Sequence, residues 1–323
     1  MTAFTRRALT DSDAPAFVAL SAAIFDADGG GHRADEGDFR RFLHHPLAAP
    51  GFEDFQGVFD GDRLAATARV ARRELAEPVH WMAAEGGVHP DYRGRGIGTG
   101  LLRRQEELAS RIHEHYFAGH PLELSVRVTE HNEGARELFA NEGYQPIRWS
   151  FEMRRPADTP VQETEPPVGL ELETYTATAC EELRTAFNEA FRDHWRALPM
   201  SAADWEHWIN QEKVRHDLSF LLRDAANGEI AGFVVASLSV PELKATGVRD
   251  LHLNLVGTRR EYRGRGVAAV LIAHAVRQSR ELGLETVTLN VDAENPTGAL
   301  GVYQRAGFEC ERKELHYAKD LMP

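Results

Sequence analysis

Apolar and polar positions alternate along the chain in two successive series of short strands and amphipathic helices. Apolar runs of strand length are separated by turn signals, of which Asp60-Gly61 and Asn227-Gly228 predict hairpins. Between the runs, apolar residues recur every three or four positions, which is typical of helices that cover a sheet. We expect strands at 4–9, 55–59, 64–70, 79–88, 122–128, 147–153, 170–175, 220–223, 230–238, 250–256, 285–291 and 313–318. We expect helices, with their caps, at about 10–25, 99–114, 132–141, 179–191, 200–211, 269–282 and 297–306, and an acidic, glycine-rich loop at 26–38.

A polar, proline-rich stretch separates the two series. Residues 155–168 contain almost no apolar side chains, which predicts a semi-extended linker. With 323 residues, the chain is long enough for two domains that each bury a core. The expected organisation is a first domain at 1–154, the linker at 155–168 and a second domain at 169–323.

One short motif occurs at the same place in both series. Residues 91–98 read DYRGRGIG, and residues 261–268 read EYRGRGVA, 170 positions later. Each copy follows an expected strand and precedes an expected helix, an arrangement in which glycines let the backbone N–H groups at the helix start approach a phosphate. The neighbouring arginines add positive charge. An ordinary turn would not need to recur in this way, so the repeat favours a phosphate-binding loop.

The motif resembles the pyrophosphate loop of the GNAT superfamily, whose members are acyl-CoA-dependent N-acyltransferases. A second GNAT-like segment follows each loop: residues 132–139 (NEGARELF) lead to 142–144 (EGY), and residues 295–303 (NPTGALGVY) lead to 306–308 (AGF). The resemblance implies an α/β fold with two tandem GNAT-like domains, each a mixed, mostly antiparallel central sheet flanked by helices. It also implies that acetyl-CoA is the co-substrate.

The same resemblance implies which residues hold the cofactor. In this family the strand before the loop offers a backbone N–H to the thioester carbonyl, a role that falls to Val256 in the second domain and to Gly86 or Gly87 in the first. Whether the first copy binds CoA or retains its glycines only for the turn stays open. The implied cofactor-binding residues are Val256, Thr258, Arg263, Gly264, Arg265, Gly266, Val267, Ala268 and Asn295, with Val88, Arg93, Gly94, Arg95, Gly96, Ile97 and Gly98 in the first domain.

The two halves differ at the positions where the family places its chemistry. A tyrosine on the helix after the next strand commonly protonates the departing thiolate, and by resemblance this is Tyr303 in the second domain, where the first has Phe139. The second copy has one extra residue between Asn295 and Tyr303, which leaves the register open. We therefore expect the second domain to be catalytic and the first to be a non-catalytic copy.

The strand before the second loop carries the candidate general base. Asp250, His252 and Asn254 alternate with leucines and so share one face, whereas Met82 takes the place of His252 in the first domain. His252 is the leading candidate, because an imidazole titrates near neutral pH; a histidine satisfied within the core is the alternative interpretation. Asp250, acting through water or orienting His252, is the second choice.

Composition narrows the class of protein. A net charge of −13 argues against a nucleic-acid binder and suits a cationic amine acceptor. The two cysteines, Cys180 and Cys310, and the lack of a long apolar run are typical of a cytoplasmic protein. The histidine pairs lack the carboxylate or cysteine partners of a metal site, and we expect none. Two fused copies favour a monomer or a weak dimer.

We therefore expect an acetyl-CoA-dependent N-acetyltransferase that acts on a primary amine of a small molecule by direct attack in a ternary complex. The tandem arrangement with an active second half is similar to that of the mycothiol synthases, and an antibiotic acetyltransferase is an alternative in the same class. A non-catalytic acyl-CoA-binding sensor is the alternative from another class. Tyr303 and the polar face of residues 250–254 argue against it.

Overall fold

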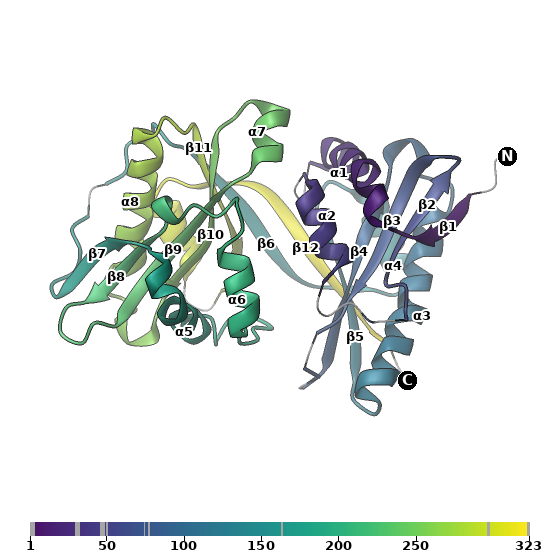
Figure 1. Cartoon of the computed structure of the whole chain (residues 1–323), viewed down its shortest axis with the longest axis horizontal. Helices are drawn as coiled ribbons and strands as arrows, with labels where there is room; N and C mark the ends of the chain where they lie inside the picture. The colour runs from purple at the N-terminus through teal and green to yellow at the C-terminus, as the bar shows by residue number, and fades with distance from the viewer. Residues whose placement is uncertain are drawn as a thin grey trace. The chain divides into compact units, whose positions relative to one another are not determined.

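The computed structural model describes residues 4–29, 33–45, 49, 51–73, 75–76, 78–162, 164–295 and 298–321. Contacts divide the chain into a first unit, Met1–Trp149 with Lys313–Pro323, and a second unit, Ser150–Arg312 (Figure 1). The first half of the chain contains β1 (Thr5–Ala8), α1 (Ala14–Asp28), α2 (Glu36–Leu43), β2 (Phe55–Asp60), β3 (Arg63–Ala71), β4 (His80–Val88), α3 (Ile97–Phe117), β5 (Leu122–Thr129), α4 (Glu133–Asn141) and β6 (Gln145–Pro156). The second half contains β7 (Leu170–Thr174), α5 (Cys180–Ala190), α6 (Ala202–Ile209), β8 (Phe220–Asp224), β9 (Ile230–Leu238), α7 (Val240–Thr246), β10 (Asp250–Thr258), α8 (Val267–Glu281), β11 (Thr286–Asp292), α9 (Ala299–Arg305) and β12 (Glu309–Leu321).

The sheet of the first unit follows the order β1-β2-β3-β4-β5 and ends with the second part of β12. Neighbouring strands are antiparallel except β4 and β5, which run parallel where residues 80–83 face residues 122–125. Helices α1 and α2 pack on one face through Phe17 and Phe39, and α3 packs on the other through Leu101 (Figure 1). Each helix buries its apolar side against the sheet, as the spacing of its apolar residues predicts.

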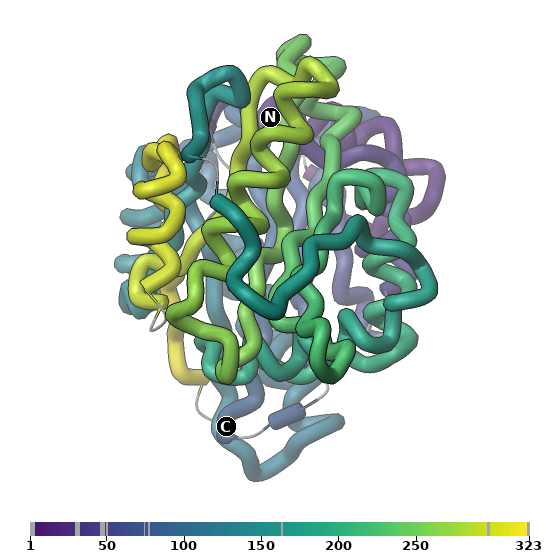
Figure 2. The backbone as a smooth tube through the Cα atoms, turned by 90° about the vertical axis from the view of Figure 1, so that its left-hand side faces the viewer, coloured from purple at the N-terminus to yellow at the C-terminus, as the bar shows by residue number. Residues whose placement is uncertain are grey.

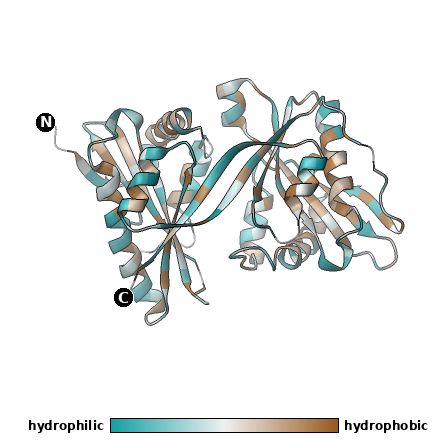
Figure 3. Cartoon of the chain, turned by 180° about the vertical axis from the view of Figure 1, so that it is seen from behind, coloured by the Kyte–Doolittle hydropathy of each residue, from teal (hydrophilic) through white to brown (hydrophobic). Residues whose placement is uncertain are grey.

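The second unit repeats this arrangement in the order β7-β8-β9-β10-β11, and the second part of β6 pairs with β11. Here β10 and β11 are the parallel pair. Helices α5 and α6 cover one face, with Trp205 and Phe233 in one cluster, and α8 and α9 cover the other, with Leu271 and Tyr303 in another. Figure 2 faces this unit, with α8 along the near side, and Figure 3 shows hydrophobic brown and hydrophilic teal alternating along the helices. The predicted α/β fold with mixed, mostly antiparallel sheets is confirmed.

Two long strands contribute to both units. Strand β6 belongs to the first unit up to Trp149 and then pairs with β11 through residues 150–156, whereas β12 belongs to the second unit up to Arg312 and then pairs with β5 through residues 314–321. Each unit therefore completes its sheet with a strand from the other half of the sequence. The first residues of the expected linker, 155 and 156, lie within β6, because backbone pairing continues past the point where the sequence becomes polar.

Helix α1 is longer than its sequence pattern predicts. It continues to Asp28, where Gly29 ends it in a left-handed conformation with φ 62°, so it takes up part of the expected loop at 26–38. At the other end of the chain, the expected helix cap at Thr297 lies outside the described residues, and α9 follows Gly298.

Two short helices, α2 and α7, are absent from the expected elements. The carboxylate of Asp35 accepts from the N–H of Asp38 at the start of α2, and the hydroxyl of Ser239 accepts from the N–H of Glu242 at the start of α7. A capping residue followed three positions later by an acid is a recognised signal for a helix start. The signal is therefore present in the sequence for both helices, but the helices are too short for apolar periodicity to reveal them.

A pair of buried histidines lies in the core of the first unit. The Nδ1 atoms of His80 on β4 and His113 on α3 are 2.9 Å apart, and the Nε2 of His113 donates to the carbonyl of His120. His80 is fully buried, and its Nε2 has no hydrogen-bond partner among the described residues. Burial, together with the charge of a protonated His113, lowers the pKa of His80 to about 4.

The first unit is therefore expected to lose stability on acidification. His80 protonates more readily in the unfolded chain, where its ordinary pKa is 6.5, so lowering the pH from neutral towards 4 favours unfolding, by about 2 kcal/mol at pH 5. The His80→Asn variant removes this loss, whereas His131→Asn, which replaces an exposed histidine, does not. Hydrogen exchange of the β4 amides at pH 7 and pH 5 measures the difference. Equal acid sensitivity of the wild type and His80→Asn would contradict the assignment.

Candidate active site

The strands β10 and β11 of the second unit part after a short parallel contact. They pair only where residues 250–253 face residues 286–289, although both strands continue further. The pairing of β10 with β9 also shifts between Leu253 and Leu255, so Asn254 is the extra residue of a β-bulge. A bulge bends its strand and re-aims the neighbouring side chains, and bulges are frequent beside active sites. The sheet therefore opens at one place in the middle of the second unit.

A cavity of about 910 Å³ lies at this opening. Its lining includes Phe191 and His194 from the side of α5, and Val302 and Tyr303 from α9 on the opposite face of the sheet. The cavity thus passes between β10 and β11 and reaches both faces. Its volume is within the range of sites that bind small molecules and cofactors.

The glycine-rich loop forms one end of the cavity. Gly264 and Gly266 adopt left-handed conformations, with φ 75° and 86°, which explains why glycine occurs at both positions. Helix α8 starts at Val267 without a side-chain cap, and the first backbone bond of the helix is donated by Val270 to the carbonyl of Gly266. The N–H groups of the first three residues of the helix therefore have no acceptor within it, and these residues line the cavity. Together with the helix dipole they form a site for an anion such as a diphosphate.

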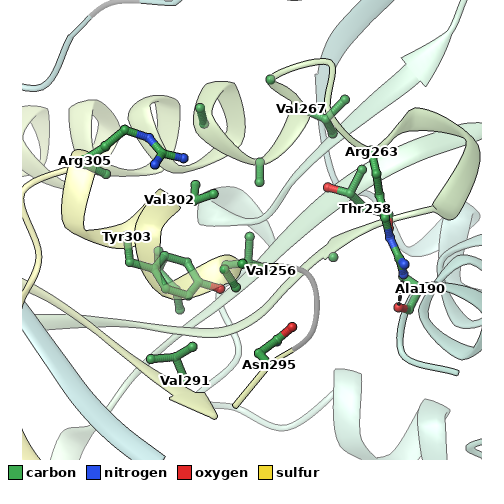
Figure 4. Close-up of a pocket in the computed structure, with 18 of the residues that line it drawn as sticks. Ala190, Val256, Thr258, Arg263, Val267, Val291, Asn295, Val302, Tyr303 and Arg305 are labelled. Carbon is green, nitrogen blue, oxygen red and sulfur yellow. Dashed lines mark hydrogen bonds between the residues drawn. The ribbon is translucent and has the colours of Figure 1, made fainter. Parts of the chain in front are cut away.

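The loop arginines bind protein groups. Arg263 donates from Nε to the carbonyl of Thr258 at 3.3 Å, and from its terminal nitrogens to the carbonyl of Ala190 at 2.9 Å and to Asp193 at 3.2 Å (Figure 4). The guanidinium of Arg265 lies 5.4 Å from the ring centre of Tyr262. Arg263 thus ties the end of α5 to the loop, which gives the backbone N–H groups the larger part in holding an anion. Direct contact between these arginines and phosphate stays a prediction.

Tyr303 projects into the cavity from the opposite side. Its phenol points towards Val256 on β10 (Figure 4). The centre of its ring lies 6.2 Å from that of Phe308. The side chain is buried, and burial raises the pKa of Tyr303 to about 12. A tyrosine hydroxyl is protonated at neutral pH even at its ordinary pKa of 10.0, and burial makes this one a weaker acid, so it can give its proton only to a strongly basic group in the cavity, such as a thiolate. The extra residue before Tyr303 does not remove it from the cavity.

The polar face of β10 lies next to the cavity on the side of α5. Ser237 pairs with His252 across the strands and donates from its hydroxyl to the Oδ1 of Asn254 at 2.6 Å. Asn254 lines the cavity. Asp250 and His252 lie further along the strand and are not among the described residues that line it. Both candidates for the general base therefore lie beside the cavity. His252 is two residues and Asp250 four residues before Asn254 along β10.

Several lining residues are outside the set that the sequence predicts. Asn290 lies on β11, two residues after Thr288, and lines the cavity. No motif in the sequence distinguishes it from the other polar residues of that strand. Val161, Gln162 and Thr164 come from the stretch expected as a linker and reach the cavity of the second unit. A segment without periodicity carries no signal for such a contact.

The set of predicted residues that line the cavity is Val256, Thr258, Arg263, Gly264, Gly266, Val267, Ala268, Asn295 and Tyr303. Within the described part of the chain, Arg265 is not among the lining residues. No group of three or more His, Cys, Asp or Glu side chains in the described ranges is arranged to hold a metal ion. No described helix has the length and apolar character needed to cross a bilayer.

The corresponding place in the first unit contains the end of α1. Gly94 and Gly96 adopt the same left-handed conformations, and α3 starts at Ile97 as α8 starts at Val267. However, α1 has 15 residues where α5 has 11, which adds about one turn of helix. That last turn carries Asp28.

Asp28 connects both sides of the place where β4 and β5 part. Its carboxylate accepts two hydrogen bonds from Arg93 of the loop, at 2.7 and 2.9 Å, and one from the side chain of Asn132, at 2.9 Å. Its carbonyl accepts from the hydroxyl of Thr129 at 3.2 Å. A Cβ atom on Gly87 would lie 2.7 Å from the side chain of Ile24, so α1 also packs closely on the strand. The first unit therefore has protein where the second unit has a cavity.

Known proteins resemble this chain over nearly its whole length. Residues 180–308 match a model of the acetyltransferase (GNAT) family, and residues 55–146 match one of an acetyltransferase (GNAT) domain. A mycothiol acetyltransferase of Thermobispora bispora is 29% identical over 319 residues, 96% of this chain and 97% of the relative. One of Nocardia farcinica is 31% identical over 249 residues, 74% of this chain and 75% of the relative. The crystal structure of a GCN5-related N-acetyltransferase from Sphaerobacter thermophilus is 28% identical with a TM-score of 0.77, covering 99% of this chain and 96% of that one.

Proposed function

Because this chain belongs to the GNAT family of acetyltransferases, we propose that its second unit transfers the acetyl group of acetyl-CoA to a primary amine of a small molecule by direct attack in a ternary complex. Acetyl-CoA is the co-substrate of this family. The observation that carries the proposal is the cavity between β10 and β11, which has uncapped helix N–H groups at one end and the phenol of Tyr303 within it. An anionic thioester with a long, narrow arm fits such a passage.

Each group in and beside the cavity has a separate role in the proposed reaction. The N–H groups at the start of α8 bind the diphosphate, and the backbone N–H of Val256 polarises the thioester carbonyl. The amine nitrogen attacks the carbonyl carbon, so that a C–N bond forms and the C–S bond breaks. His252 takes the proton that the amine loses, directly or through water, and Tyr303 gives its proton to the sulfur of the leaving thiolate. Both groups then exchange protons with solvent and return to their starting states.

The acceptor is proposed from chemistry and from the relatives together. A net charge of −13 favours a cationic amine over an anionic acceptor. The relatives are called mycothiol acetyltransferases, and mycothiol synthases acetylate the cysteinyl amine of a sugar conjugate. A cysteinyl amine on an amino sugar is therefore the first acceptor to test, and an aminoglycoside antibiotic is the second.

Turnover with a panel of amines tests the proposal. We expect release of the CoA thiol, and a product heavier by one acetyl group, with the cysteinyl amino-sugar conjugate in the panel. Initial rates at several concentrations of both substrates should give intersecting lines in double-reciprocal plots, because Cys180 and Cys310 do not line the cavity and no described residue there suggests a covalent relay. Parallel lines would contradict direct attack. Binding of acetyl-CoA without acetylation of any amine would favour the non-catalytic sensor.

A further inference from the structure

We infer that Thr288 is a positioning residue for the proposed general base, because its hydroxyl joins the carboxylate of Asp250 to the imidazole of His252 and selects the tautomer of that ring. The inference rests on the proposed function of the second unit and extends it. It concerns the face of the sheet beside the cavity, where β10 and β11 still run in register.

The register of the two strands brings the three side chains together. Asp250 pairs with Thr286, and His252 pairs with Thr288, so all four side chains are on one face. The hydroxyl of Thr288 donates to the Oδ2 of Asp250 at 2.5 Å, and the hydroxyl of Thr286 donates to the Oδ1 of Asp250 at 2.5 Å. The Nδ1 of His252 lies 3.0 Å from the Thr288 hydroxyl oxygen. Thr288 is 3% exposed, so water does not compete for its bonds.

The hydrogen count decides the tautomer of His252. A threonine hydroxyl has one hydrogen, and Thr288 uses it on Asp250. Its oxygen can then only accept from the Nδ1 of His252, which must carry the ring proton. In a neutral imidazole the lone pair is then on Nε2, the atom that takes up a proton. When the ring becomes an imidazolium, its new charge is felt by the Asp250 carboxylate through the hydroxyl bridge.

The charged groups near this chain of hydrogen bonds keep the carboxylate in place. Arg154 on β6 lies 4.0 Å from Asp250 and donates to the hydroxyl oxygen of Thr286 at 3.3 Å. Its Nε donates to Glu311 at 2.7 Å. Glu152 lies on the same strand as Arg154 and pairs with Arg312 at 3.5 Å. The acids and arginines of this face therefore largely compensate one another, with His252 as the group placed to change its charge.

The first unit has other side chains on the corresponding face of its parallel strands. Counting from the glycine-rich loop places Met82 opposite His252, but Met82 and Leu124 pack with Ile112 of α3, on the face that Leu251 and Leu253 occupy in the second unit. The bulge at Asn254 shifts the alternation of β10 by one residue, so the expected correspondence of Met82 with His252 is wrong. The pairs on the corresponding face of the first unit are Trp81 with Glu123 and Ala83 with Ser125, and neither contains an imidazole. The histidine is therefore particular to the second unit, which points to a role in its chemistry.

The Thr288→Val variant tests the inference, because valine keeps the shape of threonine and lacks the hydroxyl. We expect kcat to fall by roughly ten- to a hundredfold, with the KM for acetyl-CoA unchanged. We also expect the acid limb of the pH profile of kcat/KM to move to lower pH, since the imidazolium loses its link to Asp250. Thr288→Ser should restore most of the activity.

Two controls separate this role from a structural one. Thr286→Val also removes a hydroxyl from Asp250 but has no bond to His252, and we expect it to change kcat by less than about threefold. NMR of the histidine ring nitrogens reports the tautomer of His252 without turnover, and Thr288→Val should change it. Wild-type kcat and tautomer in Thr288→Val, or equal losses in both valine variants, would overturn the inference. Failure of the wild type to acetylate any amine would instead refute the proposed function, and the NMR result would still decide the tautomer.

Discussion

Replacement of Tyr303 by phenylalanine is expected to lower turnover on the order of a hundredfold or more, with little change in the affinity for acetyl-CoA. The hydroxyl of Tyr303 is protonated under working conditions, and although burial raises its pKa to about 12 and weakens it as an acid, a thiolate released in the same buried site is made more basic by the same loss of water, so proton transfer between them stays possible. The substitution removes only this hydroxyl. The remaining ring still packs near Phe308 in the core of the second unit, so the cavity should keep its shape. Initial rates at saturating acetyl-CoA and calorimetric titration with acetyl-CoA measure the two quantities separately.

The first unit supplies a matched control for this change. Phe139 lies on α4, the helix that corresponds to α9, and Phe139→Tyr adds a hydroxyl where the first unit has protein in place of the cavity. We expect this variant to have wild-type turnover. Wild-type turnover in Tyr303→Phe would remove Tyr303 from the proposed mechanism. Equal losses in turnover and in affinity would make Tyr303 a binding residue and not a proton donor.

Local patterns in the sequence were sufficient to predict the two glycine-rich loops and the order of the strands and the longer helices, although not the short helices α2 and α7. The glycines of 94, 96, 264 and 266 adopt the left-handed conformations that a tight turn before a helix requires. The alternation of residues 250–254 with leucines predicts which side chains share a face, and the common contact of Asp250 and His252 with Thr288 agrees with it. These features depend on neighbours in the chain, so a single sequence contains them.

Other features depend on contacts between distant residues, and the sequence carries no local signal for them. The acidic residues and glycines after residue 25 predict that the first helix ends there. The helix continues to Asp28, because the carboxylate of that residue is bound by Arg93 and Asn132, which are distant in the sequence. The bulge at Asn254 follows from the pairing of β10 with β9 and from the parting of β10 and β11. The second part of β6 pairs with β11, and the second part of β12 pairs with β5. This pairing depends on the partner strands, so the sequence of β6 or β12 alone does not predict it.

The two units share one part of the site and differ in another. Both have the loop, the uncapped helix start and the parting strands. They differ in what lies between the strands, which is protein in the first unit and a cavity in the second. They also differ beside the opening, where the second unit pairs His252 with Thr288 and the corresponding face of the first unit pairs Trp81 with Glu123 and Ala83 with Ser125. The differences fall on the residues of the proposed mechanism, which suggests that binding and chemistry were lost or gained together.

Calorimetric titration with acetyl-CoA is expected to give one binding site for each chain, with the site in the second unit. In both units a carboxylate at or just after the end of the first long helix binds the loop arginine, but Asp28 of the first unit also binds Asn132 at the start of α4, and this link would have to break before a ligand could lie between the two segments. Hydrogen bonds to charged groups contribute about 1.5–3 kcal/mol each, so breaking them reduces affinity by an order of magnitude or more for each bond lost. The second unit has its cavity already formed.

Matched arginine variants identify the unit that binds. Arg263→Ala removes the bonds from the loop to Ala190 and Asp193 and should weaken acetyl-CoA binding by at least about tenfold, because the end of α5 then no longer holds the loop beside the cavity. Arg93→Ala removes the equivalent arginine and should leave both affinity and stoichiometry unchanged, although it releases Asp28 and lowers the thermal stability of the first unit. Two sites in the wild type would contradict a closed first unit. Loss of binding in Arg93→Ala but not in Arg263→Ala would move the active site to the first unit, because the uncapped start of α3 would then be the one that holds the diphosphate.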